Sequence, residues 1–239
     1  MKTIVFLHGW GKSGETMQPF ASFFREKGYT TYAPDLPGFG SAEPPIKPWS
    51  VDDYVEWLKQ YILSLSKDDE KIILVTQSFG GRVAIKFAVK YPQYLEKLIM
   101  MGAPGMKERL SWKRWLLKLA IRFGKWWFMG VTWEVLLPWP IRKYIERKLS
   151  RLDYFRVQGV MRATLTKVVN EDLHSYLKKI TIPTLLVWGE HDEFVPLYIG
   201  QAMEKEISGA KLVVIPDARH GIYRTHPALV AQHVFSFLK

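Results

Sequence analysis

The chain has 239 residues, of which 48% are hydrophobic and 24% charged, and it contains no cysteine. This length and composition suit one large domain, or a domain with an insertion, and exclude a small disulfide-stapled scaffold and a disordered chain. The lack of cysteine also excludes thiolate metal sites, iron-sulfur clusters and a cysteine nucleophile. The formal net charge is +11, which raises nucleic acid, anionic lipid and anionic substrates as partners, so the location of the charge matters.

The amino terminus does not resemble a targeting segment. Only four apolar residues, at positions 4–7, precede His8, which is too short for the core of a signal peptide. No window of the chain approaches the roughly 20 apolar residues of a membrane span. We therefore expect a soluble, cytoplasmic protein.

Short β-rich segments alternate with amphipathic segments over most of the chain. This alternation is typical of βαβ units and predicts an α/β fold with a mainly parallel sheet of about six strands. The strands are expected at 3–7, 29–33, 71–77, 95–101, 184–188 and 211–215. The helices are expected at 51–66, 79–91, 197–207 and 227–238, with a further one that ends near Gly28.

The alternation stops after residue 105 and resumes near residue 178. The intervening residues have a helical pattern and are rich in tryptophan and in basic side chains. We therefore divide the chain into a core of residues 1–105 and 178–239 and an inserted helical segment of residues 106–177.

Ser78 lies between a predicted strand and a predicted helix, in the sequence Thr76-Gln77-Ser78-Phe79-Gly80-Gly81. A serine at such a sharp turn is lifted toward the carboxyl edge of the sheet and needs small neighbours, which Gly80 and Gly81 provide. The simpler interpretation is an ordinary helix that begins with a serine cap.

Three further segments follow predicted strands. His8-Gly9-Trp10-Gly11 comes after the first strand, and by itself it could be only a glycine-rich turn. Asp192 lies in Trp188-Gly189-Glu190-His191-Asp192-Glu193-Phe194-Val195-Pro196, and His220 lies in Ala218-Arg219-His220-Gly221 after the last strand.

In this order, the four segments resemble the α/β-hydrolase superfamily, and the resemblance covers essentially the whole chain apart from the insertion. It implies that Ser78 is the nucleophile, Asp192 the acid and His220 the base. It also implies that the backbone N–H groups of Trp10 and Phe79 form the oxyanion hole.

The chain departs from the family in two places. Thr76 occupies the position of the first glycine in the family's Gly-x-Ser-x-Gly motif. Only seven residues precede His8, so we expect the antiparallel strands that open the sheet in many relatives to be missing.

Other titratable residues receive plainer interpretations. Glu190 and Glu193 are the alternatives to Asp192 as the acid. His191 could approach a metal together with Asp217 and His220, but no regular ligand spacing supports this, and we expect neither a metal nor a cofactor. His8 is interpreted as a loop-shaping residue. Surface or capping roles are expected for His174, His226 and His233.

The insertion carries most of the excess positive charge. Between residues 106 and 151 there are twelve Lys or Arg residues and three Glu residues, and six of the ten tryptophans. The resemblance implies that this segment is a helical cap over the active site, with an aromatic face that contacts the substrate. The substrate-binding candidates are Trp112, Trp115, Trp126 and Trp127.

The pattern of tryptophan opposite lysine and arginine also fits a helix that adsorbs weakly to an anionic membrane surface. Nucleic-acid binding is not expected, because no groove-reading module surrounds the charge. These two interpretations of the insertion, cap and membrane contact, both stay open on the sequence.

The function favoured by the sequence is hydrolysis of carboxylic esters with small to medium hydrophobic acyl groups, lactones included, through an acyl-enzyme. One alternative is hydrolysis of carbon-carbon bonds in diketone-type substrates. Another is a non-catalytic, hydrolase-like protein that binds a ligand or a membrane.

Overall fold

The computed structural model describes residues 2–65, 70–106 and 158–239, and the account below concerns these. Contacts between Cα atoms divide the chain into one unit of Met1–Lys107 and Gly159–Lys239 and a second of Glu108–Gln158. The first unit contains every element described here. Within the described residues, no helix is long and apolar enough to cross a membrane.

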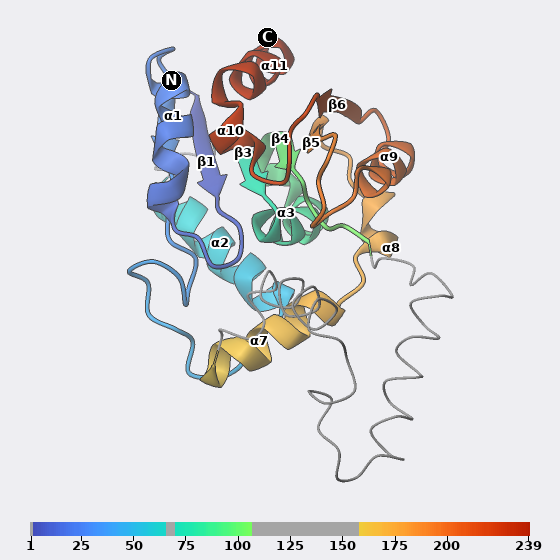
Figure 1. Ribbon diagram of the computed structural model, residues 1–239. Helices are drawn as coiled ribbons and strands as arrows, with labels where there is room; N and C mark the ends of the chain where they lie inside the picture. The colour runs from blue at the N-terminus through green and yellow to red at the C-terminus, as the bar shows by residue number, and fades with distance from the viewer. Residues whose placement is uncertain (1, 66–69, 107–157) are drawn as a thin grey trace, which may run out of the picture. The chain divides into compact units, whose positions relative to one another are not determined.

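The centre of the first unit is a six-stranded sheet, with the order β2-β1-β3-β4-β5-β6, in which all neighbouring strands are parallel (Figure 1). This confirms the predicted fold class, and the described residues include no antiparallel strand in the sheet. The strands are β1 (Thr3–Leu7), β2 (Thr30–Tyr32), β3 (Ile72–Gln77), β4 (Leu95–Met101), β5 (Thr184–Gly189) and β6 (Lys211–Ile215).

Helices cover both faces of this sheet (Figure 1). The α-helices of the described residues are α1 (Gln18–Arg25), α2 (Val51–Leu65), α3 (Phe79–Lys90), α7 (Gly159–Asn170), α8 (His174–Leu177), α9 (Leu197–Glu206), α10 (Ile222–Thr225) and α11 (Pro227–Leu238). Two short 3-10 helices are also present, at Gly14–Met17 and Pro92–Tyr94.

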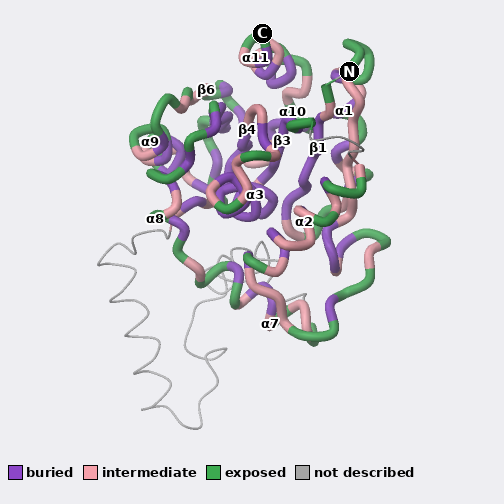
Figure 2. The backbone as a smooth tube through the Cα atoms, turned by 180° about the vertical axis from the view of Figure 1, so that it is seen from behind, coloured by how far each residue is buried: buried purple, intermediate pink, exposed green. Residues whose placement is uncertain are grey.

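The sheet separates two hydrophobic cores, because successive side chains of a strand alternate between its two faces. In β3, Leu74 packs on the side of α2, α3, α8 and α9, whereas Ile73 and Val75 pack on the side of α1, α10 and α11. Successive strand residues point to opposite faces, and a strand that is buried on both faces is apolar throughout. All six residues of β3 are buried, and most residues of β1 and β4 beside it are buried too (Figure 2).

Helices α7 and α8 fall within the residues that the sequence assigns to the insertion, but they belong to the same compact unit as the sheet. The Thr164 hydroxyl of α7 accepts a hydrogen bond of 3.1 Å from the backbone N–H of Trp49. Lys167 Nζ donates one of 2.9 Å to the Pro48 carbonyl. These contacts fasten α7 to the loop that precedes α2.

Candidate active site

Ser78 occupies a sharp turn between β3 and α3. Its backbone has φ 49° and ψ −110°, a conformation that is rare for residues other than glycine and that costs on the order of 1–3 kcal/mol. Its N–H still donates to the Met101 carbonyl at 2.9 Å, so the residue is held at the end of the strand ladder. The simpler interpretation, an ordinary serine cap, does not fit. The Ser78 side chain makes no capping hydrogen bond to α3, and a cap residue normally has an extended backbone.

The small residues after Ser78 allow α3 to pack closely on its neighbours. A Cβ atom at Gly80 would lie 2.7 Å from the Leu7 carbonyl oxygen, and one at Gly81 would lie 2.3 Å from Ala103 Cβ. Both approaches are too close for a larger side chain. The glycines are therefore required by the packing of the turn against β1 and the end of β4.

Thr76 fits the turn despite its departure from the family motif. The residue is fully buried, and its hydroxyl donates a hydrogen bond of 3.3 Å to the Ile99 carbonyl of β4. The buried hydroxyl of Thr76 thus has a hydrogen-bond partner on the neighbouring strand, β4.

Asp192 and His220 are joined by a hydrogen bond. His220 Nδ1 lies 2.7 Å from Asp192 Oδ2. The other carboxylate oxygen, Oδ1, accepts the backbone N–H groups of Phe194 at 2.9 Å and Val195 at 2.8 Å. Since a carboxylate accepts, Nδ1 donates in this hydrogen bond, and in the neutral imidazole Nε2 then carries the lone pair.

Both residues stand on loops that the strands β5 and β6 place side by side. His191 N–H donates to the Ala218 carbonyl at 2.8 Å. A Cβ atom at Gly189 would lie 2.5 Å from that same carbonyl oxygen. The acid loop is fixed further by Trp188, which is fully buried and whose indole N–H donates to the Val195 carbonyl at 2.8 Å.

The end of β4 lies between Ser78 and the Asp192–His220 pair. Met101 accepts the Ser78 N–H, and the next residue, Gly102, adopts φ 54°. A Cβ atom at Gly102 would lie 3.1 Å from both Asp192 Oδ2 and His220 Nδ1. Ser78 thus contacts Met101, and the Asp192–His220 pair lies close to the next residue, Gly102. The described residues include no hydrogen bond between Ser78 and His220. Such bonds are often long in enzymes without substrate.

The His8-Gly9 segment passes directly over the Ser78 turn. A Cβ atom at Gly9 would lie 2.1 Å from Gln77 Oε1 and 3.4 Å from Ser78 Cβ. His8 is buried, donates from Nδ1 to the Gly9 carbonyl at 2.8 Å and accepts the Leu36 N–H on Nε2 at 3.0 Å. Burial lowers the pKa of His8, against the opposing effects of the Gly9 carbonyl and Asp35. The loop-shaping interpretation of His8 agrees with these bonds.

The side chains of Trp10 and Phe79 lie in contact, with ring centroids 5.1 Å apart. Phe39 packs against both, at 4.8 Å from Trp10 and 6.0 Å from Phe79. Neither backbone N–H takes part in a turn, loop or cap hydrogen bond within the described residues, and the first N–H groups of a helix have no intrahelical partner. The Phe79 N–H, which directly follows Ser78 in the chain, is one such group of α3.

Phe194 is a residue of this site that sequence reasoning missed. Its ring lies 5.3 Å from the imidazole of His220, and the side chain is 57% exposed. A large apolar ring exposed beside a polar site offers a surface to an apolar ligand. The available signal was its place two residues after Asp192. Gly102 was also missed, because its closeness to Asp192 and His220 depends on the fold.

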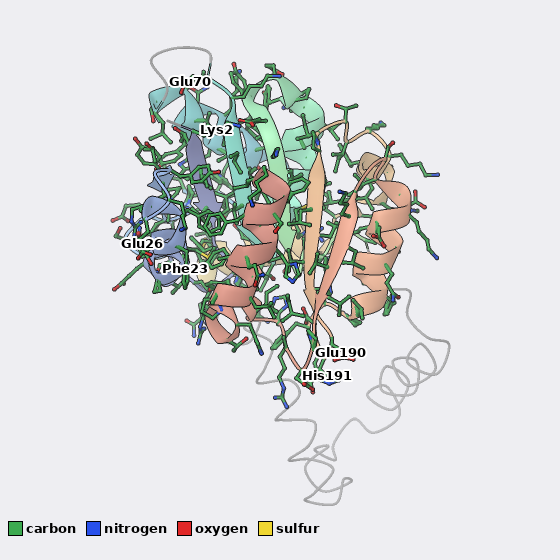
Figure 3. All side chains as sticks on the ribbon, turned by 90° about the horizontal axis from the view of Figure 1, so that it is seen from above. Lys2, Phe23, Glu26, Glu70, Glu190 and His191 are labelled. Carbon is green, nitrogen blue, oxygen red and sulfur yellow. The ribbon has the colours of Figure 1, made fainter. Side chains whose placement is uncertain are left out.

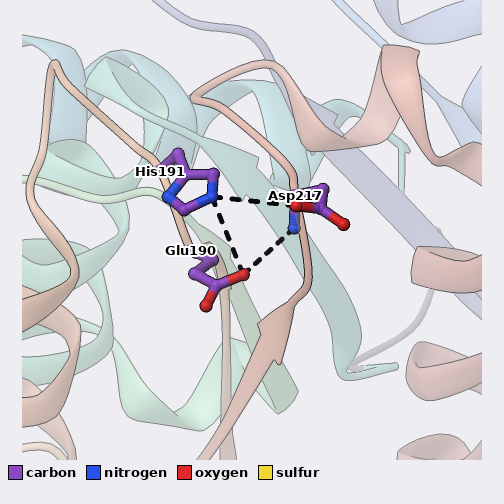
Figure 4. Close-up of side chains that lie close together, drawn as sticks. All are labelled: Glu190, His191 and Asp217. Carbon is purple, nitrogen blue, oxygen red and sulfur yellow. Dashed lines mark hydrogen bonds and ion pairs between the residues drawn. The ribbon is translucent and has the colours of Figure 1, made fainter.

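Glu190, His191 and Asp217 form a second cluster at the same end of the sheet (Figure 4). Glu190 and His191 lie opposite the end marked by Lys2 and Glu70, which precede β1 and β3 (Figure 3). Glu190 Oε2 accepts the Asp217 N–H at 3.1 Å, and His191 Nε2 lies 3.9 Å from Glu190 Oε2 and 3.8 Å from Asp217 Oδ1. His220, which the sequence analysis considered as a possible metal ligand with His191 and Asp217, is hydrogen-bonded to Asp192 instead. All three clustered residues are exposed.

The remaining histidines are placed as follows. His226 is the residue before α11, and His174 lies 3.5 Å from Glu206 on an exposed surface. His233 is partly buried on α11. The substrate-binding candidates of the insertion, Trp112, Trp115, Trp126 and Trp127, lie outside the described residues.

The chain is similar to known proteins over nearly its whole length. The sequence model of the group described as the alpha/beta hydrolase family matches residues 4–233. An uncharacterized hydrolase of Bacillus subtilis is 26% identical over 262 residues, spanning 100% of this chain and 90% of that protein. The pimeloyl-acyl-carrier-protein methyl ester esterase of Wigglesworthia glossinidia brevipalpis is 26% identical over 253 residues, spanning 99% and 93%.

Another relative is the 2-hydroxy-6-oxononadienedioate/2-hydroxy-6-oxononatrienedioate hydrolase of Escherichia coli, 28% identical over 261 residues, spanning 99% of this chain and 87% of that protein. Among solved structures, an esterase from Exiguobacterium antarcticum superposes with a TM-score of 0.74 at 21% identity. That comparison covers 100% of this chain and 92% of the esterase. At this identity the likeness concerns the fold.

Proposed function

The chain belongs to the alpha/beta hydrolase family, and we propose that it is a serine hydrolase of carboxylic esters. The single observation that carries this proposal is the 2.7 Å hydrogen bond between His220 Nδ1 and Asp192 Oδ2. It lies at the edge of the sheet where Ser78 occupies its strained turn. A hydroxyl, an imidazole with a free nitrogen and a buried carboxylate are the three groups that acyl transfer requires.

The proposed reaction has two halves, formation of an acyl-enzyme and its hydrolysis, and both use the same residues. Ser78 Oγ attacks the ester carbonyl while His220 Nε2 takes its proton. The N–H groups of Trp10 and Phe79 then hold the developing oxyanion. His220 returns the proton to the leaving alcohol. In the second half water attacks the acyl-Ser78 ester while His220 takes a proton from the water. The bond between the acyl carbon and Ser78 Oγ then breaks, His220 returns the proton to Ser78 Oγ, and the carboxylic acid is released. Asp192 keeps the imidazole in the required tautomer throughout.

The proposed substrates have hydrophobic acyl groups of small to medium size, and lactones are the cyclic case of the same reaction. Support comes from two aromatic rings that are not fully buried, those of Trp10, which follows the His8-Gly9 segment, and of Phe194, 5.3 Å from the His220 ring. The buried rings of Phe39 and Phe79 pack behind Trp10. Apolar walls with a few polar groups are typical of small-molecule sites. The tryptophans of the insertion are proposed to add to this surface.

The test is hydrolysis of p-nitrophenyl esters from acetyl to decanoyl, and of methyl esters and lactones, by the wild type and by Ser78→Ala. Ester turnover that falls by about 10³-fold or more in the variant supports the proposal. Equal turnover by both proteins, or none by the wild type on any ester or lactone, contradicts it.

The second candidate is carbon-carbon bond hydrolysis, which is favoured by the relatives named as hydrolases of 2-hydroxy-6-oxononadienedioate. The same oxyanion chemistry would serve a carbonyl next to the bond that is cleaved. Turnover of a vinylogous diketone in the absence of ester turnover would establish this candidate. Tight ligand binding without any turnover would instead favour the non-catalytic alternative.

A further inference from the structure

Residues 101–105, which begin at the last residue of β4, contact both parts of the site. We call them the bridging segment. The main-chain carbonyl of the first residue accepts the Ser78 N–H at 2.9 Å. A Cβ atom at the second, Gly102, would lie 3.1 Å from both Asp192 Oδ2 and His220 Nδ1. The separation of the serine hydroxyl from the imidazole therefore depends on where the bridging segment lies.

Hydrogen bonds hold the bridging segment near its start and near its end. The Gly102 N–H donates to the Val187 carbonyl of β5 at 3.1 Å. Pro104 has no N–H to donate, but its carbonyl accepts a hydrogen bond of 2.7 Å from Arg82 Nη1. The end of the bridging segment is thus bound by a side chain of α3, the helix that begins directly after Ser78.

Arg82 is itself fixed by its surroundings. It lies about one helical turn after Ser78 and is only 5% exposed, although arginine is almost never buried without partners. Its Nη2 donates to the carbonyl of Glu171, and the planar guanidinium holds both donors in one rigid fork. Burial lowers the pKa of Arg82 to about 10, against the opposing charges of Glu171 and Asp172, so the group is charged at neutral pH.

Small residues bring α3 and the bridging segment into close contact on either side of Arg82. A Cβ atom at Gly81 would lie 2.3 Å from Ala103 Cβ, and one at Gly105 would lie 3.0 Å from Ile85 Cδ1. Packing at this density transmits a displacement of one element to the next. A shift of the bridging segment away from α3 would therefore reach the residues that it contacts on its other side.

We propose that Arg82 is a positioning residue, which binds the Pro104 carbonyl, holds the bridging segment against α3 and thereby keeps His220 within reach of Ser78. The effect on catalysis rests on the proposed function. A misplacement of about 1 Å between reacting groups can lower a rate by about 10²-fold. The loss of this one hydrogen bond should therefore slow the reaction of Ser78.

The test variant is Arg82→Met, and Lys86→Met is its matched control. Lys86 lies one turn further along α3 and is 4% exposed. Its Nζ binds carboxylate oxygens of Asp52 and Glu171, which lie outside the bridging segment. Removal of a buried cation destabilises both variants. The pair of variants therefore separates a loss of stability, which urea unfolding measures, from a loss of alignment.

The first measurement is the rate at which a fluorophosphonate labels Ser78 in the folded protein. We expect this rate to fall at least about tenfold in Arg82→Met and to stay within about twofold of the wild type in Lys86→Met. Arg82→Lys keeps the charge but not the planar fork. Its rate should lie between those of Arg82→Met and the wild type, at least about threefold below the latter, and it serves alone if Arg82→Met does not fold.

The second measurement is independent of ester hydrolysis. The proton between His220 Nδ1 and Asp192 Oδ2, which are 2.7 Å apart, should give a far-downfield proton NMR resonance that is missing in His220→Ala. The resonance should shift or broaden in Arg82→Met and in Arg82→Lys, and it should keep its position in Lys86→Met.

Two results would overturn the inference. One is an equal labelling rate of Ser78 in the Arg82 variants and in Lys86→Met. The other is a His220 resonance that has the same position in the Arg82 variants as in the wild type. A wild type that takes no label on Ser78 would overturn the proposed function and with it the effect on catalysis, whereas the His220 resonance still decides whether Arg82 positions the imidazole.

Discussion

The hydrogen bond between Asp192 and His220 assigns a role to each nitrogen of the imidazole. Replacing Asp192 by Asn keeps the shape of the side chain but permits its amide to donate toward Nδ1, which favours the wrong tautomer. We expect kcat for an ester to fall by about 10³- to 10⁴-fold in Asp192→Asn. Steady-state kinetics measure this.

The matched control is Glu193→Gln, which neutralises an exposed acid in the same loop. It should keep its activity within about threefold, because surface changes away from the reacting groups have small effects. A comparable loss of kcat in both variants would show that the loop, and not the carboxylate on His220, is what matters.

His8 provides a pH-dependent contribution to stability. Its pKa lies below the ordinary value of 6.5 in the folded chain, so the unfolded chain binds more protons there as the pH falls. The stabilising effect of neutral His8 is therefore complete above about pH 6.5 and is lost as the pH falls toward the folded-state pKa. Urea unfolding at pH 8 and pH 5 measures this effect.

The comparison variant is His8→Gln, which has no titratable ring. At pH 8 the wild type should be the more stable protein, by about 1–2 kcal/mol from the two hydrogen bonds of the imidazole. At pH 5 this difference should shrink. A difference that grows on acidification would contradict the neutral, buried state of His8.

At the scale of elements, α3 packs closely on β1 at Gly80. In Gly80→Ala the added Cβ would lie 2.7 Å from the Leu7 carbonyl oxygen and 2.8 Å from Leu7 Cβ. Forced overpacking of this kind costs about 1–3 kcal/mol, and the shift of α3 should also lower kcat by displacing Ser78. Denaturant unfolding and ester kinetics report the two effects.

A suitable control is Gln60→Ala on the exposed side of α2, where the change should remain within about 0.5 kcal/mol. If Gly80→Ala is as stable and as active as this control, α3 does not depend on a glycine beside β1.

The sequence alone predicts most elements of the core, because buried strands leave clear apolar runs. The strands at 3–7, 95–101 and 211–215 have the predicted bounds. The predicted strand at 29–33 is shorter, Thr30–Tyr32, because β2 pairs only with Thr3–Val5 of β1. Helix α10 was not predicted, since four residues are too few to show a helical period.

The site was predictable to the extent that its residues directly follow strands. Ser78, Asp192 and His220 come after β3, β5 and β6, whose carboxyl ends lie at one edge of the sheet. The motifs around them are short stretches of sequence. Gly102 was not predictable, because its closeness to His220 arises only in the folded chain. For Phe194 the sequence offered only its place two residues after Asp192. The sequence likewise contained no sign that Arg82 and Glu171 would meet.

At the scale of the whole molecule, the charge is concentrated in one segment. Residues 106–151 hold twelve basic and three acidic residues, so +9 of the net +11 belongs to this segment. We propose that it contacts anionic membrane surfaces weakly. The protein should sediment with anionic vesicles at low salt, and the bound fraction should fall steeply toward 0.5 M salt as screening shortens to about 4 Å.

Neutral phosphatidylcholine vesicles are the control. Equal binding to both kinds of vesicle, or no binding to the anionic ones at low salt, would leave the segment with the cap role alone. Ester hydrolysis does not depend on this outcome.

The most direct test of the central claim is covalent labelling of the intact protein with a fluorophosphonate, followed by intact-mass measurement and peptide mapping. A Ser78 that is activated by His220 should take up one label per chain, on the peptide that contains Ser78. Labelling should be absent in Ser78→Ala and slowed by about 10³-fold in His220→Ala. A label on another residue, or equal labelling of Ser78→Ala and the wild type, would contradict the assignment of Ser78 as the nucleophile.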